Sequence, residues 1–289
     1  MSTATGPAAG LPVRMPRPRQ PGRHRRPEPL AAPEGAPVLV LAVPGTPTPA
    51  VRSLAEEVLS IARSELSGLD PRIGYLEGDD AEFPTLQTVL TQAAADRADE
   101  STAAVVVPLL AGPDTAVVRR IRQAVTDSRC GTEVTDVLGP HPLLAEALHV
   151  RLSEAGLARA DRARLFTVAT AADGIILATV GGEEAVQAAG VTGLLLAARL
   201  AVPVLAAALD VDGSIARAAE QLRSSGSTNL ALAPCLIGPE VAAPLLQSAA
   251  EEAGCSGADA LGPYPAVGKL VVAKYTTALG IAPQGAPTH

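Results

Sequence analysis

The 289-residue sequence is poor in aromatic side chains: it has no tryptophan, two phenylalanines and three tyrosines. Proteins that bind single-stranded nucleic acid without sequence preference stack the bases on aromatic rings, so this composition argues against that function. The formal net charge is -7, so no overall electrostatic field attracts the chain to DNA or to an acidic membrane surface. We therefore expect neither nucleic acid nor a membrane among its partners.

Cysteine and long apolar segments are also scarce. Cys130, Cys235 and Cys255 are odd in number and show no CxxC spacing, so the sequence indicates neither a disulfide framework nor a zinc ribbon. No apolar run reaches the roughly 20 residues that a membrane-spanning helix needs. The arginines near the N-terminus are not followed by the apolar stretch of a secretory signal. We expect a cytoplasmic protein.

Residues 1–36 differ in composition from the rest of the chain. They contain six arginines and two glutamates among many prolines, glycines and alanines, with almost no large apolar side chains. Such a segment cannot offset the entropy lost on ordering, and we predict a disordered Pro/Arg-rich arm. A solvated tail is the simpler interpretation, and contact of the basic run at residues 23–26 with an acidic partner is the alternative.

Beyond this arm, short β-branched runs alternate with segments of helical periodicity, which is typical of a parallel sheet covered by helices on both faces. The run VLVLAV at residues 38–43 has the composition of a buried parallel strand. The pattern predicts strands at residues 38–43, 73–76, 103–109 and 136–138, and helices at residues 51–66, 86–98, 116–126 and 141–155.

The second half of the chain repeats the first. VVVPLLAGPD at residues 105–114 corresponds to ALAPCLIGPE at residues 231–240, and LGPHP at residues 138–142 corresponds to LGPYP at residues 261–265. VLVLAVPG at residues 38–45 is echoed by IILATVGG at residues 175–182. Three paired segments in the same order predict an α/β protein of two duplicated lobes, residues 37–160 and 161–289. Because the lobes are fused, we expect a monomer.

Acidic residues and glycines follow the predicted strands at matching places in the two lobes. Ligands of doubly wound sheets bind beyond the carboxyl ends of the strands. Glu77 and Asp114 occupy such positions in lobe 1, and Asp210 and Glu240 occupy them in lobe 2. We expect one such rim in each lobe, the two facing each other across a cleft.

Several of these segments resemble the sirohydrochlorin chelatases of the CbiX/SirB type, a group of class II tetrapyrrole chelatases. The segments are LGPHPLLAEAL (residues 138–148), VVVPLLAG (105–112), the stretch from Tyr75 to Leu86, and LRSSGSTNLALAPCLIG (222–238). The resemblance implies a tetrapyrrole, sirohydrochlorin or a similar molecule, bound between the lobes. It also implies a lyase that inserts Co²⁺ or Fe²⁺, as a substrate, in cobalamin or siroheme biosynthesis.

The sequence departs from that family at the histidines that bind metal and accept protons. Where the family has a histidine after the first strand, this chain has Pro44, which offers no side-chain ligand and no backbone N–H. Where a second histidine is expected, the chain has Asp114 or a neighbouring residue. Glu77 matches the acidic residue that the family carries after the second strand.

The resemblance assigns candidate site residues in spite of these losses. Glu77 and Asp114 are the candidate catalytic residues, and Glu77, Asp114 and Glu240 are the candidate metal ligands. The candidate tetrapyrrole-binding glycines are Gly45, Gly112, Gly182 and Gly238. For Asp114 and Glu240, which follow Gly-Pro, a purely structural role at a helix start is the alternative.

Two functional hypotheses remain open from the sequence. In the first, the carboxylates still hold the metal and accept the pyrrole protons, although carboxylates bind Co²⁺ and Fe²⁺ less tightly than imidazole does and are weak bases near pH 7. In the second, the chain is a catalytically degenerate homologue that binds a tetrapyrrole or regulates another enzyme. His141 is not a ligand in either one, because Tyr264 replaces it in the other lobe and it more plausibly closes a turn.

Overall fold

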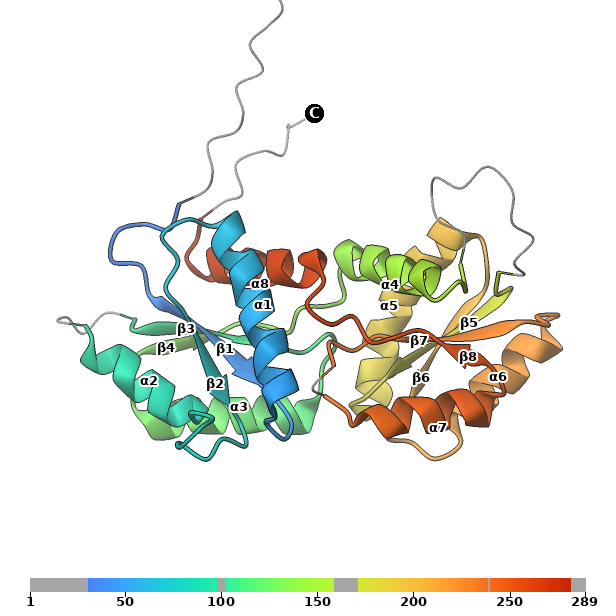
Figure 1. Ribbon diagram of the computed structural model, residues 1–289, viewed down its shortest axis with the longest axis horizontal. Coiled ribbons are helices and arrows are strands. Elements are labelled where there is room, and N and C mark those ends of the chain that lie inside the picture. Colours follow the sequence, from blue (N-terminus) through green and yellow to red (C-terminus); the bar gives the residue numbers. More distant parts are fainter. Residues whose placement is uncertain (1–30, 98–101, 159–170, 239, 282–289) are drawn as a thin grey trace, which may run out of the picture.

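The computed structural model describes residues 31–97, 102–158, 171–238 and 240–281, and it consists of two lobes side by side (Figure 1). Each lobe contains a four-stranded, fully parallel sheet. The sheet of lobe 1 has the order β2-β1-β3-β4, formed by β1 (Val38–Val43), β2 (Pro71–Tyr75), β3 (Ala104–Pro108) and β4 (Thr132–Val134). The α/β class predicted from the alternating pattern is confirmed.

The strand order of lobe 2 repeats that of lobe 1. It is β6-β5-β7-β8, with β5 (Gly174–Thr179), β6 (Val204–Ala208), β7 (Leu230–Pro234) and β8 (Ser256–Gly257). The central strands β3 and β7 both end on a proline, Pro108 and Pro234, at the offset that the repeated segments predict. Two sheets of identical order confirm the internal duplication.

Helices cover both faces of each sheet, as the fully buried central strands require. They are α1 (Pro49–Glu65), α2 (Leu86–Ala95) and α3 (Thr115–Ser128) in lobe 1, and α5 (Gly182–Leu200), α6 (Ser214–Ser224) and α7 (Ala243–Ala253) in lobe 2. Along β1, Leu39 and Leu41 join a core that extends into lobe 2, whereas Val40 joins a separate core beneath α2 and α3. The shared core holds the two lobes together.

The last helix of each half packs on the other lobe. Helix α4 (Pro142–Glu154) follows β4 but contacts α5 and β7, and α8 (Pro265–Ala278) follows β8 but contacts α1 and β3. Figure 1 shows α8 beside α1, and α4 beside α5. The hydroxyl of Tyr275 in α8 donates to the carbonyl of Pro37, at 2.5 Å, next to the start of β1. In each of the predicted lobes, residues 37–160 and 161–289, the final helix therefore packs on the other lobe.

The start of the chain only partly tests the predicted arm. Residues 1–30 lie outside the described residues. The rest of that segment is bonded to lobe 1: Ala32 N donates to Ser67 O at 2.8 Å, and the Arg97 guanidinium donates to the carbonyls of Gly35 and Ala36. Ordered structure in lobe 1 therefore begins before residue 37.

The strand predicted at residues 136–138 is wrong. The fourth strand of lobe 1 lies earlier, at Thr132–Val134, where two β-branched residues flank Glu133 and the strand pairs with β3. Residues 135–141 instead form the connection that carries the chain to lobe 2. The helix predicted at residues 141–155 is confirmed as α4, with His141 as its N-cap. Within the described residues, no helix combines the length and apolar character needed to cross a membrane.

Candidate functional site

The loops that follow the strands of the two lobes touch each other. Thr115 Oγ1, at the start of α3, donates to Glu184 Oε2, at the start of α5, over 2.8 Å. Gly181 has a φ of +108°, and a Cβ atom there would collide with the carbonyl oxygen of Pro113. A Cβ atom on Gly112 would lie 3.7 Å from Thr179 Oγ1. The two rims expected from the sequence thus meet at the centre of the molecule.

Glu77, the acidic residue retained from the family pattern, is held by an arginine and a threonine. Its Oε1 accepts from Arg120 Nη1 at 3.1 Å, and its Oε2 accepts from Thr46 Oγ1 at 3.2 Å. About two fifths of its side chain (39%) is exposed. Arg120 therefore supplies the positive charge beside this carboxylate.

Asp210 is the counterpart of Glu77 in lobe 2 and makes contacts of the same kind. Its carboxylate accepts from the backbone N–H groups of Gly181 and Gly182, each at 3.1 Å, in the turn after β5. In both lobes the acid after the second strand binds the turn after the first strand. A structural role in fixing that turn explains both residues without a metal.

Asp114 caps helix α3. Its Oδ1 accepts from the backbone N–H groups of Ala116 and Val117, at 2.9 and 3.0 Å, and its backbone is extended, as an N-cap requires. These bonds satisfy two of the N–H groups that have no partner within the helix. The helix-start alternative accounts for every contact of Asp114, and the geometry adds no support for a catalytic role.

Substitution of Asp114 separates the structural role from a metal-binding one. Asp114→Ala should lower the free energy of unfolding by about 1 kcal/mol, the usual cost of removing an N-cap. Asp114→Ser should restore most of that loss, because serine is also a good N-cap, while it removes the carboxylate. Urea unfolding followed by circular dichroism measures both. If Asp114→Ser were as unstable as Asp114→Ala, capping would not be the role of this residue.

Glu240 folds back onto its own loop. Its two carboxylate oxygens accept from the backbone N–H groups of Ile237, at 2.8 Å, and Gly238, at 2.6 Å. Burial raises the pKa of Glu240, and these hydrogen bonds oppose the rise. The carboxylate therefore binds the backbone of its own loop. That loop places Gly238 next to lobe 1, where a Cβ atom built on Gly238 would lie 3.2 Å from Leu54 Cδ1.

The candidate glycines serve different purposes. Gly45 (φ +75°) and Gly182 (φ +67°) adopt the left-handed conformation in the turns after β1 and β5. Gly112 and Gly238 lie where the lobes meet. Open space adjoins only some of them: nothing lies within 4 Å of a Cβ built on Gly182. Tetrapyrrole binding by these four residues stays a prediction.

No metal centre is evident in the described part of the chain. Among those residues, no group of three or more His, Cys, Asp and Glu side chains could hold a metal ion. The three candidate carboxylates, Glu77, Asp114 and Glu240, each bind separate partners. The predicted three-carboxylate metal site therefore gains no support from the geometry.

The two histidines within the described residues also have structural partners. His141 Nδ1 accepts from the backbone N–H of Leu143 at 3.1 Å, and His149 Nδ1 accepts from Arg199 Nε at 2.8 Å. A neutral imidazole that accepts through Nδ1 carries its proton on Nε2. Burial, together with the nearby Lys274 ammonium, lowers the pKa of His141. It is therefore a neutral N-cap near pH 7, in agreement with the turn-closing interpretation.

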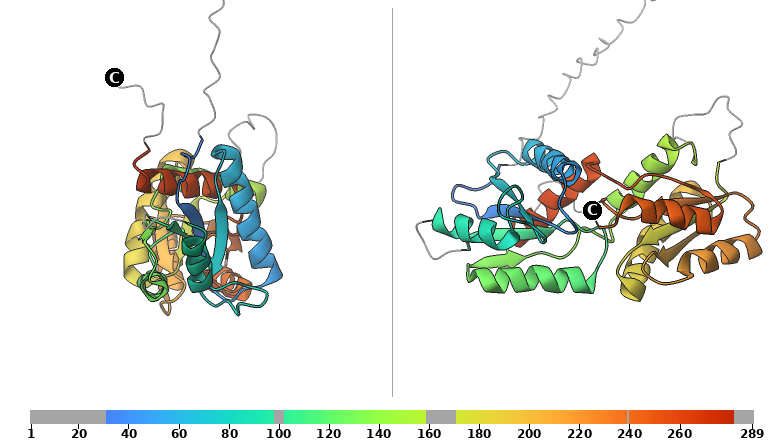
Figure 2. Two further views of the ribbon diagram at one scale, coloured as in Figure 1. Left: turned by 90° about the vertical axis from the view of Figure 1, so that its left-hand side faces the viewer. Right: turned by 60° about the horizontal axis from the view of Figure 1, so that its bottom comes forward.

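A pocket of about 860 Å³ lies between the lobes and is lined by several cations. We call it the interlobe pocket. Figure 2 shows α3 of lobe 1 and α5 of lobe 2 on the same side of the molecule. Its lining comes from α3, the β4–α4 connection, α5 and α8: Pro113, Thr115, Val118, Arg119, Arg122, Gln123, Thr126, Thr135, Asp136, Val137, Gly139, Pro140, Glu184, Ala188 and Lys274.

The interlobe pocket carries more positive than negative charge, in a chain whose net charge is -7. Arg119, Arg122 and Lys274 line it against Asp136 and Glu184. None of the three cations has a salt-bridge partner among the described residues. Lys274 reaches the pocket only because α8 packs on lobe 1. A ligand bearing carboxylates would find unoccupied donors here.

The sequence analysis missed these cations. Arg119 and Arg122 are three residues apart and therefore share a face of α3, and that spacing could have been read from the VVRRIRQ segment at residues 117–123. The contribution of Lys274 could not have been found in this way, because it depends on the exchange of α8 between lobes.

Comparison with known proteins gives one family match. Residues 38–155 match the family model described as CbiX. No curated protein matches the sequence significantly. Among solved structures, DR2241 from Deinococcus radiodurans superimposes with a TM-score of 0.53 at 18% sequence identity. DR2241 is described as a multi-domain protein with structural similarity to chelatases and two additional novel domains. The alignment covers 86% of this chain and 55% of that longer one.

Two transport proteins show weaker similarity. The 5-methylthioribose transporter solute-binding protein from Thermotoga lettingae has a TM-score of 0.34 at 14% identity, over 87% of this chain and 84% of its own. The periplasmic ribose ABC transporter from Conexibacter woesei has a TM-score of 0.32 at 14% identity, over 86% and 70%. Neither value supports a functional comparison. Residues 38–155 therefore match the CbiX family model, and the fold of the whole chain is similar to that of DR2241.

Proposed function

We propose that the chain binds a tetrapyrrole of the sirohydrochlorin type in the interlobe pocket and does not accelerate metal insertion into it. The observation that carries this proposal is a pocket of about 860 Å³ between the two lobes, lined by Arg119, Arg122 and Lys274, which have no salt-bridge partner in the part of the chain that the structure describes. That volume is within the usual range for pockets that bind small molecules and cofactors.

The chemistry of the lining suits such a ligand. A sirohydrochlorin-type macrocycle has a large apolar ring that carries carboxylate side chains. Val118, Val137 and Ala188 offer apolar contact to the ring, and the two arginines of α3 can form charge-assisted hydrogen bonds with carboxylates. Lys274 approaches from the opposite helix, α8, so that carboxylates on different edges of one ring could be bound together.

Among the residues that the structure describes, no cluster of side chains could hold a metal ion, which supports the second half of the proposal. Metal insertion requires a ligand for the incoming ion and an acceptor for the two pyrrole protons. Glu77, the retained acid, is paired with Arg120, whose guanidinium competes with a metal cation for the carboxylate. An ionised carboxylate is also a weaker base than imidazole near pH 7.

One observation favours the rival function, slow insertion through a carboxylate. Glu77 is exposed over 39% of its side chain, and Arg120 over 51%. An exposed ion pair contributes little stability and can open. A tetrapyrrole that displaced Arg120 would leave Glu77 free to accept a proton.

The experiment compares binding with insertion. Purified protein is titrated into sirohydrochlorin, and the absorbance spectrum is followed without metal and then after addition of Co²⁺ or Fe²⁺. Glu77→Ala is the matched variant for catalysis. We expect a saturable spectral change without metal, and insertion rates equal to those of a protein-free control for both proteins.

The other outcomes contradict one part of the proposal or all of it. Insertion faster than the control that is lost in Glu77→Ala would establish a carboxylate-based chelatase and overturn the loss of catalysis. No spectral change at saturating protein would overturn tetrapyrrole binding itself.

A further inference from the structure

A second pocket lies at the free edge of the lobe 1 sheet. Its volume is about 390 Å³, and it is bounded by α1, by α2 and by the edge strand β2. We call it the edge pocket. It is lined by Arg52, Glu56, Leu59, Arg63, Pro71, Arg72, Ile73, Tyr75, Pro84, Val89 and Gln92. None of these residues lines the interlobe pocket.

The edge pocket contains a buried hydroxyl group that lacks a partner. Tyr75 is only 2% exposed, and its hydroxyl makes no hydrogen bond within the described residues. The ring of Tyr75 is fixed edge-on against Phe83, with 5.3 Å between centroids and 84° between planes. Burial raises the pKa of Tyr75 and the neighbouring Arg52 guanidinium opposes the rise, so the hydroxyl keeps its proton near pH 7 and can donate it. Nearly all buried polar groups in folded proteins are bonded, and this exception calls for an external partner.

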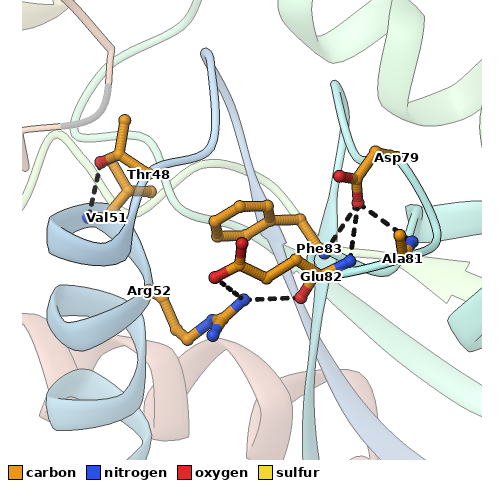
Figure 3. A network of polar contacts seen from close by, with 7 residues as sticks. All are labelled: Thr48, Val51, Arg52, Asp79, Ala81, Glu82 and Phe83. Carbon is orange, nitrogen blue, oxygen red and sulfur yellow. Dashed lines mark hydrogen bonds and ion pairs between the residues drawn. The ribbon is translucent and has the colours of Figure 1, made fainter.

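Arg52 holds the wall of the edge pocket in place. Its Nη2 donates to the carbonyl of Glu82 at 2.6 Å and lies 3.2 Å from the Glu82 carboxylate. Its guanidinium carbon lies 4.5 Å from the centre of the Phe83 ring. Figure 3 shows Arg52 reaching from α1 to Glu82 beside that ring. Both contacts to Glu82 use Nη2, and the guanidinium also acts on the Tyr75 hydroxyl, where it opposes the rise in pKa.

The remaining lining combines the cation of Arg63 with the Glu56 carboxylate and apolar surface. Arg63, two turns beyond Glu56 on α1, has no ion-pair partner among the described residues. Leu59, Ile73 and Val89 supply the apolar contacts. Guanidinium groups bind carboxylates in a bidentate manner, and a phenol hydroxyl can donate a hydrogen bond to the same carboxylate.

We propose that the edge pocket binds a small carboxylic acid with an apolar body, whose carboxylate accepts from the Tyr75 hydroxyl and pairs with Arg63. The apolar body lies on Leu59, Ile73 and Val89. This site is separate from the interlobe pocket, so the proposal for it does not depend on tetrapyrrole binding.

The test uses benzoate as the probe and benzamide as its neutral counterpart, titrated into the full chain by calorimetry at constant ionic strength. We expect saturable binding of benzoate and binding of benzamide at least about tenfold weaker, since a hydrogen bond to a charged group is worth more than one to a neutral group. Tyr75→Phe should weaken benzoate binding about fivefold and Arg63→Gln about tenfold. Arg217→Gln, which removes a cation that lines neither pocket, should leave benzoate binding unchanged.

A second measurement keeps the proposal testable if the variants alter folding. Without ligand, Tyr75→Phe should be at least as stable to urea as the natural chain, because the hydroxyl that it removes has no partner. A clear loss of stability would mean that the hydroxyl is bonded inside the protein, which overturns the proposal. Benzoate that fails to saturate, or that binds equally to the natural chain and to Tyr75→Phe, overturns it as well.

Discussion

Replacing Arg119 and Arg122 together with glutamine should weaken sirohydrochlorin binding about 100-fold. The two guanidinium groups lie on one face of α3 in the interlobe pocket, without salt-bridge partners in the described residues. A hydrogen bond to a charged group contributes about 1.5 kcal/mol or more, and each 1.4 kcal/mol changes affinity tenfold. Fluorescence or absorbance titration of the free tetrapyrrole measures the dissociation constant.

The control for that experiment removes the same charge elsewhere. Arg63→Gln with Arg217→Gln also lowers the net charge by two, but neither residue lines the interlobe pocket. If this control weakened binding as much as the α3 pair did, the effect would come from the overall field and not from contacts in the pocket. The loss of sirohydrochlorin affinity caused by the two α3 substitutions should also be smaller at high salt, because exposed charges are screened.

Substitution of Gly268 should have the largest effect on stability. Gly268 lies in α8 where it crosses α1, and a Cβ atom there would lie 2.5 Å from Cγ2 and 2.6 Å from Cβ of Ile61. Because Ile61 is β-branched and fixed within α1, Gly268→Ala should force the helices apart. We expect a loss of about 1–3 kcal/mol in the free energy of unfolding, as for other overpacked sites.

Gly190 provides the matched control for this prediction. It also lies inside a helix, α5, but nothing lies within 4 Å of its hypothetical Cβ. Gly190→Ala should therefore stabilise the protein by about 0.5–1 kcal/mol, the gain expected from helix propensity alone. Urea unfolding of both variants compares them directly. If Gly268→Ala were also stabilising, α8 could not be packed against α1 as described.

The fold was largely predictable because its signals are local. The buried run at residues 38–43, the repeated LLAGPD-like segments and the prolines that end β3 and β7 each reflect one strand and its loop. The error at residues 136–138 arose where the signal is short: three residues of strand are hard to distinguish from an apolar connection. The exchange of α4 and α8 leaves no periodic pattern, because an amphipathic helix packs equally well on its own lobe or on another.

The candidate site was less predictable because it depends on pairing between distant residues. The sequence located Glu77 and Asp114 at the ends of strands and offered a helix start as the alternative role of Asp114, which caps α3, but it did not predict Arg120 beside Glu77. A carboxylate in a loop has the same composition whether it binds a metal, an arginine or a helix end. The sequence also could not predict that the buried hydroxyl of Tyr75 has no hydrogen-bond partner in the described residues, since a tyrosine in a strand is ordinarily a core residue.

The central claim is that the interlobe pocket holds the tetrapyrrole. Its most direct test is a crystal structure of the full chain grown with saturating sirohydrochlorin and no metal. We expect the macrocycle between α3 and α5, with carboxylates within hydrogen-bonding distance of Arg119, Arg122 and Lys274. Density for the ligand at any other place, or none in crystals of protein that binds it in solution, would contradict this account.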